Sequence, residues 1–370
     1  MTPAAVGQLQ KAGISVIVES GAGEPAGFLD ASYVDKGAKT GSRADALAAH
    51  IVAAVQVAGG DPEHPDLASL HAGQIVVGMV RPFAAPEVSA AVAARGVALL
   101  ALELVPRITR AQSMDVLSSQ ANIAGYKAVI LAAESLPKVF PLLTTAAGTI
   151  APARVFIVGA GVAGLSAIAT ARRLGAVVEA YDVRSAVREE VQSLGARFVE
   201  LPLETGQEGG GSGAYAQQMS EETLRKQREL MAKTVAGSDV VITTAQVQGR
   251  RAPMIVTAEM VAGMAPGSVV VDLAADQGGN CELTRAGETV EHGGVKIIGP
   301  RNLPATVPHH ASLTYAKNVA NFLAVLVKDG AAVLDTDDEV VTECLVARDG
   351  DIVNQRVKDA LAEAKEPVTR

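Results

Sequence analysis

Short apolar runs rich in β-branched residues alternate with helical patterns along most of the chain. Near the start of the chain, the predicted strands are residues 14–19, 50–57, 74–80 and 97–103, with helices at 45–50 and 86–95. In the middle of the chain, the predicted strands are residues 154–158, 177–181, 197–200, 239–243, 268–273 and 295–298. Strands that alternate with helices in this way indicate an α/β fold with mostly parallel sheets.

Two longer segments, residues 119–136 and 312–328, are apolar almost all round and predict long buried helices. For the second helix, Ser312 is a plausible N-cap, and Gly330 lies just past the expected end. We interpret the two helices as links between two domains, because they bracket the second set of strands. The predicted division is a discontinuous Rossmann-like domain (residues 1–118 and 312–370) and a second Rossmann domain (residues 119–311). A ligand is expected in the cleft between the domains, at the carboxyl ends of the strands.

The segment RVFIVGAGVAG, residues 154–164, joins a predicted strand to a predicted helix through a glycine-rich turn. Gly159 permits a tight turn, Gly161 allows a pyrophosphate to approach the backbone, and Gly164 allows close helix–strand packing. The next strand ends at Asp182, where a carboxylate would accept hydrogen bonds from an adenosine ribose. The pattern predicts a dinucleotide site. The alternative is a βαβ unit whose turn is rich in glycine for structural reasons alone.

Polar side chains crowd the stretch between one buried strand and the first long helix. They are Arg107, Arg110, Gln112, Asp115, Ser118, Ser119 and Gln120. Loops that leave a strand at its carboxyl end often carry binding sites. Alternatively, Ser118 or Ser119 caps the helix and the arginines form surface ion pairs. The segment DLAADQGGNCE, residues 272–282, is a second polar loop after a strand, and it could equally be a turn without function.

Composition narrows the class of protein. The chain has 370 residues, 49% of them hydrophobic and 19% charged, which predicts a folded globular protein of about two domains. A net charge of −8 argues against a nucleic-acid partner. Cys281 and Cys344 stand far apart, which predicts neither a disulfide framework nor a zinc site, and His309 and His310 are adjacent rather than spaced as metal ligands. With no hydrolase motif in the sequence, a nucleotide-dependent redox step remains.

Two further segments bear on location and binding. The first residues carry no long apolar stretch typical of a secretory signal. The most apolar window, residues 88–105, contains Arg95 and Glu103 and divides at Gly96 into helix, turn and strand, which excludes a membrane span. The tract ETGQEGGGSGA, residues 204–214, predicts a mobile loop that ends at Tyr215.

Several motifs together resemble one family. RAQSMDVLSSQANIAGYKAV, GAGVAG with Asp182, ITTAQVQGRRAP and VVVDLAADQGGNCE are similar to the NAD(H)-binding component of proton-translocating nicotinamide nucleotide transhydrogenases, the first part of their alpha subunit. The resemblance covers essentially the whole chain, and alanine dehydrogenases are its wider relatives. It implies a homodimer of two-domain chains at the cytoplasmic face of the bacterial membrane, holding NADH. The implied partners are a membrane-spanning second part of the alpha subunit and a beta subunit that binds NADP(H), with hydride transfer coupled to proton translocation.

The resemblance also implies roles for individual residues. Those at the nicotinamide end of NAD, which we expect to be catalytic, are Arg107, Gln112, Asp115 and Ser118. Those around the pyrophosphate and the adenosine are Gly159, Gly161, Val162, Gly164, Asp182, Val183 and Arg184. Further expected contacts are Ala214, Tyr215, Gln227 and Gln246, with Tyr215 on a loop that closes over the nucleotide. Ala214 replaces a glycine expected before that tyrosine, and the loop has about three additional small residues.

One departure from the family concerns the first domain. Its members begin with another strand and an Arg-containing turn before the segment matched here by MTPAAVGQL, so we expect a bare sheet edge. Two other functions stay open. An alanine dehydrogenase needs a basic pyruvate site, yet HIVAAVQV carries no lysine and Arg81 stands where those enzymes place a histidine. A non-catalytic NAD-sensing module, like a transhydrogenase, would need no general acid or base. The RAQSMD segment favours the transhydrogenase.

Overall fold

The computed structural model describes residues 1–200, 221–247, 249–328 and 330–365, and the chain forms two compact units. Unit 1 comprises Met1–Ala121, Gln248–Arg250 and Pro304–Arg370, and unit 2 comprises Asn122–Val247 and Arg251–Leu303. The long helix α5 (Val116–Ser135) begins in unit 1 and continues into unit 2. The predicted α/β class with mostly parallel sheets is confirmed.

Unit 2 is built on a seven-stranded sheet in the order β10-β9-β8-β11-β12-β14-β13. Its strands are β8 (Arg154–Val158), β9 (Val177–Tyr181), β10 (Arg197–Phe198), β11 (Val240–Thr243), β12 (Val269–Asp272), β13 (Thr289–His292) and β14 (Val295–Ile298). All neighbours pair in parallel except β13, which pairs with β14 antiparallel. The strand order reverses between β8 and β11, and such a switch point is where doubly wound sheets bind dinucleotides.

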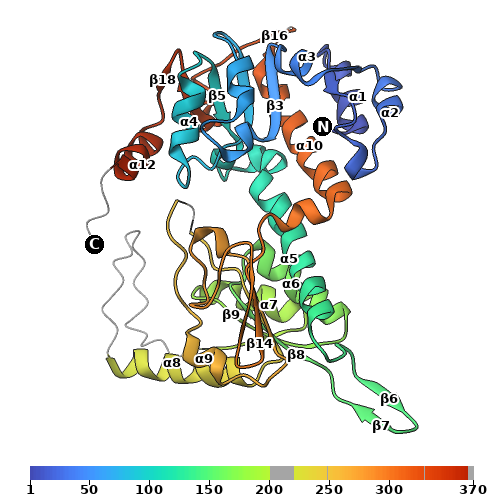
Figure 1. Ribbon diagram of the computed structural model, residues 1–370, viewed down its shortest axis with the longest axis vertical. Helices are drawn as coiled ribbons and strands as arrows, with labels where there is room; N and C mark the ends of the chain where they lie inside the picture. The colour runs from blue at the N-terminus through green and yellow to red at the C-terminus, as the bar shows by residue number, and fades with distance from the viewer. Residues whose placement is uncertain (201–220, 248, 329, 366–370) are drawn as a thin grey trace. The chain divides into compact units, whose positions relative to one another are not determined.

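Helices cover both faces of this sheet (Figure 1). On one face, α6 (Val162–Arg173), α7 (Arg188–Ser193) and the second half of α5 pack against Val155, Ile157 and Ile242. On the other face, α8 (Glu221–Ala236) and α9 (Ala258–Ala262) cover Phe156 and Val241. Because both faces are covered, the central strands are mostly apolar, which explains why β8 and β9 have the bounds that the sequence predicted.

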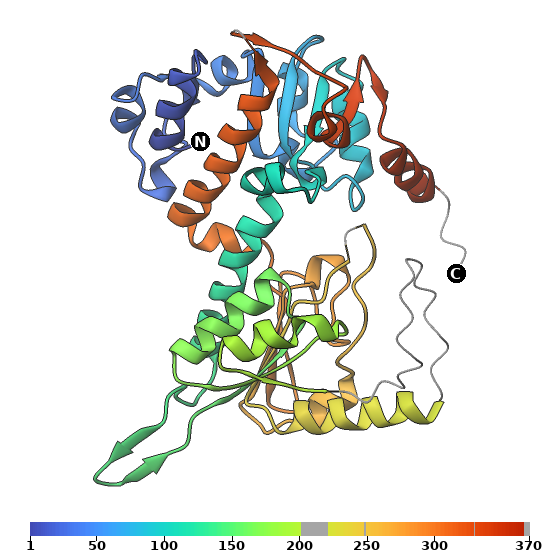
Figure 2. The ribbon, with the colours of Figure 1, turned by 180° about the vertical axis from the view of Figure 1, so that it is seen from behind.

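A hairpin of unit 2 has no such packing. Strands β6 (Leu143–Thr145) and β7 (Gly148–Ile150) pair antiparallel, and every residue in them is exposed. The hairpin projects away from the body of its own unit (Figure 2).

Unit 1 contains a five-stranded sheet in the order β18-β17-β5-β4-β3. Its strands are β3 (Ile51–Gln56), β4 (Ile75–Met79), β5 (Ala98–Ala101), β17 (Leu345–Arg348) and β18 (Asp351–Ile352). On one face lie α1 (Pro3–Lys11), α10 (Pro308–Leu326) and α11 (Glu339–Cys344), and on the other lie α4 (Pro86–Ala93) and α12 (Gln355–Lys365). A separate parallel pair is formed by β1 (Ile17–Glu19) and β2 (Lys39–Gly41). Among the described residues, β3 and β18 are the edge strands of this sheet.

Several local predictions need correction. The helix α10 begins at Pro308 after the N-cap Val307, so Ser312 lies inside the helix; proline at the first helical position, not a serine cap, marks this start. The same helix ends at Leu326, and Gly330 instead follows β15 (Val327–Lys328). The helix predicted at 45–50 is α3 (Arg43–Leu47), capped by Ser42 through a capping box with Asp45.

Candidate functional site: the glycine turn and strand ends of unit 2

Two of the three glycines in the turn after β8 stand where any other residue would strain the backbone or clash with it. Gly159 has φ +97°, which L side chains rarely adopt. A Cβ on Gly164 would lie 1.9 Å from the carbonyl oxygen of Gly159, so α6 can cross the turn only with glycine there. By contrast, a Cβ on Gly161 would meet no atom within 4 Å. Gly161 therefore leaves open space beside the start of α6.

This open space lies where an anion is favoured. Gly161 is the N-cap of α6 and has no side chain to bond the first amides of the helix, and Val162 follows it with a side chain 41% exposed. The first N–H groups of a helix have no partner within the helix and form a positive dipole end. The turn therefore fits a pyrophosphate: it offers N–H donors and a surface from which no Cβ projects.

Asp182, the predicted ribose acceptor, follows β9 and lies beside this turn. Its Oδ2 accepts a hydrogen bond from the Ala160 amide at 2.7 Å, which joins the ends of β8 and β9. Both carboxylate oxygens also accept bonds from the Arg184 guanidinium, each at 3.0 Å. Burial raises the pKa of Asp182, but these bonds outweigh it and hold the pKa below its usual value. Asp182 is thus an ionised acceptor whose present partner is Arg184.

Val183, which lies between Asp182 and Arg184 in the sequence, has 74% of its surface exposed. Its side chain is therefore free to contact a ligand rather than the core.

The ends of β11 and β12 complete this edge of the sheet. Gln246, three residues past β11, donates from Nε2 to the carbonyl oxygen of Leu273 at 2.7 Å. The Thr244 hydroxyl donates to the Gly159 carbonyl oxygen at 3.0 Å, which connects this loop to the glycine turn. The ends of β8, β9, β11 and β12 are thus connected at one edge of the sheet in unit 2.

Two residues that sequence reasoning did not assign hold this loop in place. Asn280 donates from Nδ2 to the carbonyl oxygens of Ala245 and Pro253, and its Oδ1 accepts from the Ala245 amide. Asp272 is fully buried and accepts five hydrogen bonds, from the amides of Ala274, Asn280 and Cys281 and the hydroxyls of Thr243 and Thr284. The signal was present in the polar loop 272–282: an acid at the end of a buried strand needs many donors.

The other predicted group lies in unit 1, in the 3₁₀ segment Thr109–Met114 and the start of α5. Asp115 accepts from the Ser118 amide at 2.9 Å and from its hydroxyl at 2.6 Å. Asp115, rather than a serine, thus caps the helix, and Ser119 instead donates to Asn318 of α10. Arg110 forms a bidentate pair with Asp338.

Arg107 and Gln112 differ from these neighbours. Both are exposed, and neither side chain makes a hydrogen bond or ion pair within the described part of the chain. Their polar groups are therefore available to a ligand.

Of the remaining predicted contacts, one lies within the described residues and two lie outside them. Gln227 lies half-buried in α8. Ala214 and Tyr215 fall in 201–220, outside the described residues, as does the predicted loop 204–214.

The strand order, the glycine turn and Asp182 define the class: an α/β protein with a dinucleotide-binding unit. Two family models match, "Alanine dehydrogenase/PNT, N-terminal domain" over residues 1–124 and "Alanine dehydrogenase/PNT, C-terminal domain" over residues 128–355. The chain is 43% identical to the first part of NAD(P) transhydrogenase subunit alpha from Rickettsia prowazekii, over 97% of this chain and 93% of that protein.

Solved structures agree with this assignment. A transhydrogenase of Sinorhizobium meliloti matches with a TM-score of 0.85 and 44% identity, over 95% of each chain. An L-alanine dehydrogenase matches with a TM-score of 0.81 but only 26% identity, over 98% of this chain and 95% of that one. The chain therefore belongs to the family formed by the first part of NAD(P) transhydrogenase subunit alpha, a family of oxidoreductase subunits. Among the described residues, no helix is long and apolar enough to cross a membrane.

Proposed function

We propose that this chain is the NAD(H)-binding component of a proton-translocating transhydrogenase. The observation that supports it most is the glycine turn of unit 2, where the open face of Gly161, the start of α6 and the ionised Asp182 lie at the switch point of the sheet. The pyrophosphate would bind the turn from Gly159 to Gly164. The adenosine ribose would compete with Arg184 for Asp182, with Val162, Val183 and Gln246 as further contacts. Gln227, Ala214 and Tyr215 remain proposed contacts on the strength of the family resemblance.

Bound NADH would supply a hydride that passes directly to NADP⁺ held by a partner component. Such a transfer moves no proton at the carbon centre, so the chain needs no general acid or base. Its task is to hold the nicotinamide so that the two reacting carbons come within about 3–3.5 Å. We assign this task to Gln112 and Arg107, because their side chains have no partner in the described residues. The Asp115–Ser118 pair fixes the end of the segment that carries Gln112.

The proposed partners are a beta subunit that binds NADP(H) and a membrane-spanning second part of the alpha subunit. The relatives are named as subunit alpha or as the first part of that subunit, which supports a complex of several subunits. We further propose that the chain is a homodimer attached to the cytoplasmic face of the membrane through these partners, and that hydride transfer is coupled there to proton translocation.

The experiment that tests this function changes Gln112 to Leu or Asn. A residue that orients the reacting rings acts mainly in the transition state, so the loss should appear in the rate of transfer. A misplacement of about 1 Å can cost roughly a hundredfold. We expect at least that loss in a rapid-mixing assay with the NADP-binding component, and NADH affinity within about a few-fold of the unmodified chain.

Gln355→Leu is the matched control, because Gln355 is an exposed glutamine of α12 in the same unit. It should leave both rate and affinity unchanged. Equal losses of rate and affinity in the Gln112 variants would make Gln112 a plain binding contact. Oxidation of NADH by the isolated chain with pyruvate and ammonia would replace the proposal with an alanine dehydrogenase.

A further inference from the structure

Two asparagine side chains of α10 hold the carbonyl oxygen of Ser113 in unit 1. Asn318 donates to this oxygen from Nδ2 at 2.8 Å, and Asn321 donates from its own Nδ2 at 3.1 Å. Ser113 directly follows Gln112 in the 3₁₀ segment Thr109–Met114. A helix that is distant in sequence therefore sets the orientation of a peptide plane next to Gln112.

Asn318 is buried, and both ends of its amide have partners. The residue is 7% exposed, and its Oδ1 accepts a hydrogen bond from the Ser119 hydroxyl of α5 at 2.7 Å. Ser119 in turn accepts a bond from Nε2 of Gln120 at 3.3 Å. Because the Asn318 oxygen is bonded to a hydroxyl donor, only the NH₂ group of the amide can face the Ser113 carbonyl. The bond from Ser119 thus selects the orientation of Asn318 that holds Ser113.

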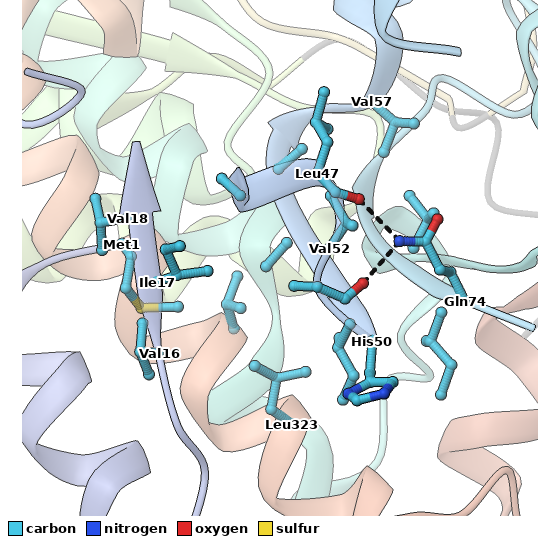
Figure 3. A pocket seen from close by; sticks show the side chains of 18 of the residues that line it. Met1, Val16, Ile17, Val18, Leu47, His50, Val52, Val57, Gln74 and Leu323 are labelled. Carbon is cyan, nitrogen blue, oxygen red and sulfur yellow. Dashed lines mark hydrogen bonds between the residues drawn. The ribbon is translucent and has the colours of Figure 1, made fainter. Parts of the chain in front are cut away.

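The two asparagines lie on a different face of α10 from its apolar side chains. A cavity of unit 1 has Leu323 of this helix in its wall (Figure 3). Because a helix turns about 100° per residue, Asn318 lies about 140° and Asn321 about 160° around the axis from Leu323. Neither asparagine lines the cavity. One face of α10 therefore forms a cavity wall, and another face holds the 3₁₀ segment.

The 3₁₀ segment depends on such outside contacts. Its residues Ala111 and Met114 are buried in the core of unit 1, whereas Gln112 and Ser113 are exposed. A short 3₁₀ turn has poor internal hydrogen-bond geometry and adds little stability of its own. A group that orients reacting atoms must be held within about 0.5 Å of its productive position. The bonds from α10 restrain the exposed side of the segment, where core packing does not reach.

We propose that Asn318 is a positioning residue for hydride transfer. It fixes the peptide between Ser113 and Met114, and through it the backbone that directs Gln112 toward the nicotinamide. The inference rests on the proposed function of Gln112. Because Asn318 is buried and its amide is fully bonded, it acts through Gln112 and not on the nucleotide itself.

The first test is a double-mutant cycle between Asn318 and Gln112, measured by rapid mixing with the NADP-binding component. Asn318→Leu replaces the amide with an apolar group of similar size. It should slow hydride transfer at least about tenfold and leave the NADH dissociation constant within about a few-fold. In a chain that already carries Gln112→Leu, the same change should slow transfer no further, because the restraint then has nothing to position. Losses that multiply in the double variant would overturn the proposal.

The second test changes the hydroxyl that orients Asn318. Ser119 is half-buried, so its substitution is a milder change than one at Asn318. Ser119→Ala should slow transfer while NADH affinity is retained, and Ser119→Thr, which keeps the hydroxyl, should preserve the rate of the unmodified chain. An unchanged rate in Ser119→Ala, or equal losses in both variants, would contradict the proposal.

Leu323→Ala is the matched control, because it removes apolar contacts of the same helix and leaves the asparagine bonds in place (Figure 3). It should lower the melting temperature of unit 1 and leave the transfer rate unchanged at temperatures where the chain is folded. A loss of rate equal to that of Asn318→Leu would mean that any damage to α10 slows the reaction, and would overturn the proposal.

The same experiments distinguish this inference from the proposed function. A full rate in Gln112→Leu would refute the function assigned to Gln112, and the inference with it. A slow Gln112→Leu variant beside a fully active Asn318→Leu variant would refute only the inference.

Discussion

Gly159, Gly161 and Gly164 in the turn after β8 belong to one sequence pattern, but in the structure each is required, or not required, for a different physical reason. At Gly159 the backbone conformation excludes other residues, and at Gly164 the neighbouring carbonyl oxygen does, since a Cβ would lie 1.9 Å from it. Gly161 is under neither constraint, because nothing lies within 4 Å of the position of a Cβ. Because the protein itself leaves room at this position, we attribute the glycine there to a ligand that needs the room.

This difference predicts opposite results for two alanine variants. Gly161→Ala should leave thermal stability unchanged and weaken NADH binding at least about tenfold, because the new methyl group occupies the approach of the pyrophosphate. Gly164→Ala should destabilise the chain by about 1–3 kcal/mol through overpacking. Melting curves and fluorescence titrations with NADH measure the two effects. Unchanged NADH affinity in the folded Gly161→Ala variant would remove the pyrophosphate from this turn.

Asp182 shows which contacts of a predicted site residue the sequence could not reveal. Its position after β9 predicted an acceptor for the ribose, and in the structure it accepts a hydrogen bond from the Ala160 amide of the glycine turn. The bidentate contact with Arg184 was not predictable, because two residues that close in sequence can point apart or together. Its consequence is that a ribose must displace a guanidinium, while a 2′-phosphate would meet both the carboxylate and the guanidinium.

At the scale of elements, burial decided which predictions succeeded. β8, β9 and β14 have the bounds expected from their apolar runs. The hairpin β6–β7 was not predicted, because all its residues are exposed and no periodic pattern marks them. The start of α10 was misplaced because Pro308 at the first helical position, and not Ser312 as a cap, begins the helix. Near this start, His309 stacks on Phe28 and its Nδ1 lies 2.8 Å from the carbonyl oxygen of Ala26.

The Arg110–Asp338 pair connects two elements of unit 1 and should make its stability depend on acid. The side-chain bond from Arg110 lowers the pKa of Asp338 from 3.8 to about 2, and Asp338 also caps α11. A carboxyl whose folded pKa is depressed stabilises the fold above its unfolded pKa and loses that effect as the pH falls through the folded value. The contribution should be present above about pH 4 and vanish toward pH 2.

Arg110→Ala measures this contribution. Because the pair is near solvent, the unmodified chain should be only slightly more stable than Arg110→Ala at pH 6. This difference in stability should shrink between pH 4 and pH 2 in denaturation experiments across that range. Arg285→Ala removes a looser surface pair with Glu288 and serves as the control, with little effect at any pH. A difference that stays constant down to pH 2 would show that Arg110 acts by packing alone.

At the scale of the whole molecule, two units with separate cores carry the two groups of predicted site residues. The glycine turn, Asp182 and Gln246 belong to unit 2, and Arg107, Gln112 and Asp115 belong to unit 1. The family resemblance, not periodicity or composition, indicated that both groups serve one reaction. Sequence patterns specify the strands and turns within a unit. That residues of unit 1 and residues of unit 2 act on the same nucleotide is a chemical prediction, which is tested by experiments on the whole chain.

Ligand-linked stability is such an experiment. A ligand that binds only the folded chain stabilises it by about 2.7 kcal/mol when present at 100 times its dissociation constant. The proposed function predicts this stabilisation for NADH in calorimetry, and a much smaller one for NADPH at the same concentration. The reason is that Asp182 is ionised and its side chain is 7% exposed, so it would repel a 2′-phosphate at close range in a partly desolvated site.

Two variants test this reason. Asp182→Asn should bring the stabilisations by NADH and NADPH closer together, and Gly161→Ala should diminish both without changing the melting temperature of the free chain. Because the chain has two units, the scans are expected to contain more than one transition, and the shift is to be measured for each. Equal stabilisation by NADH and NADPH in the unmodified chain would mean that Arg184, rather than Asp182, sets the nucleotide preference.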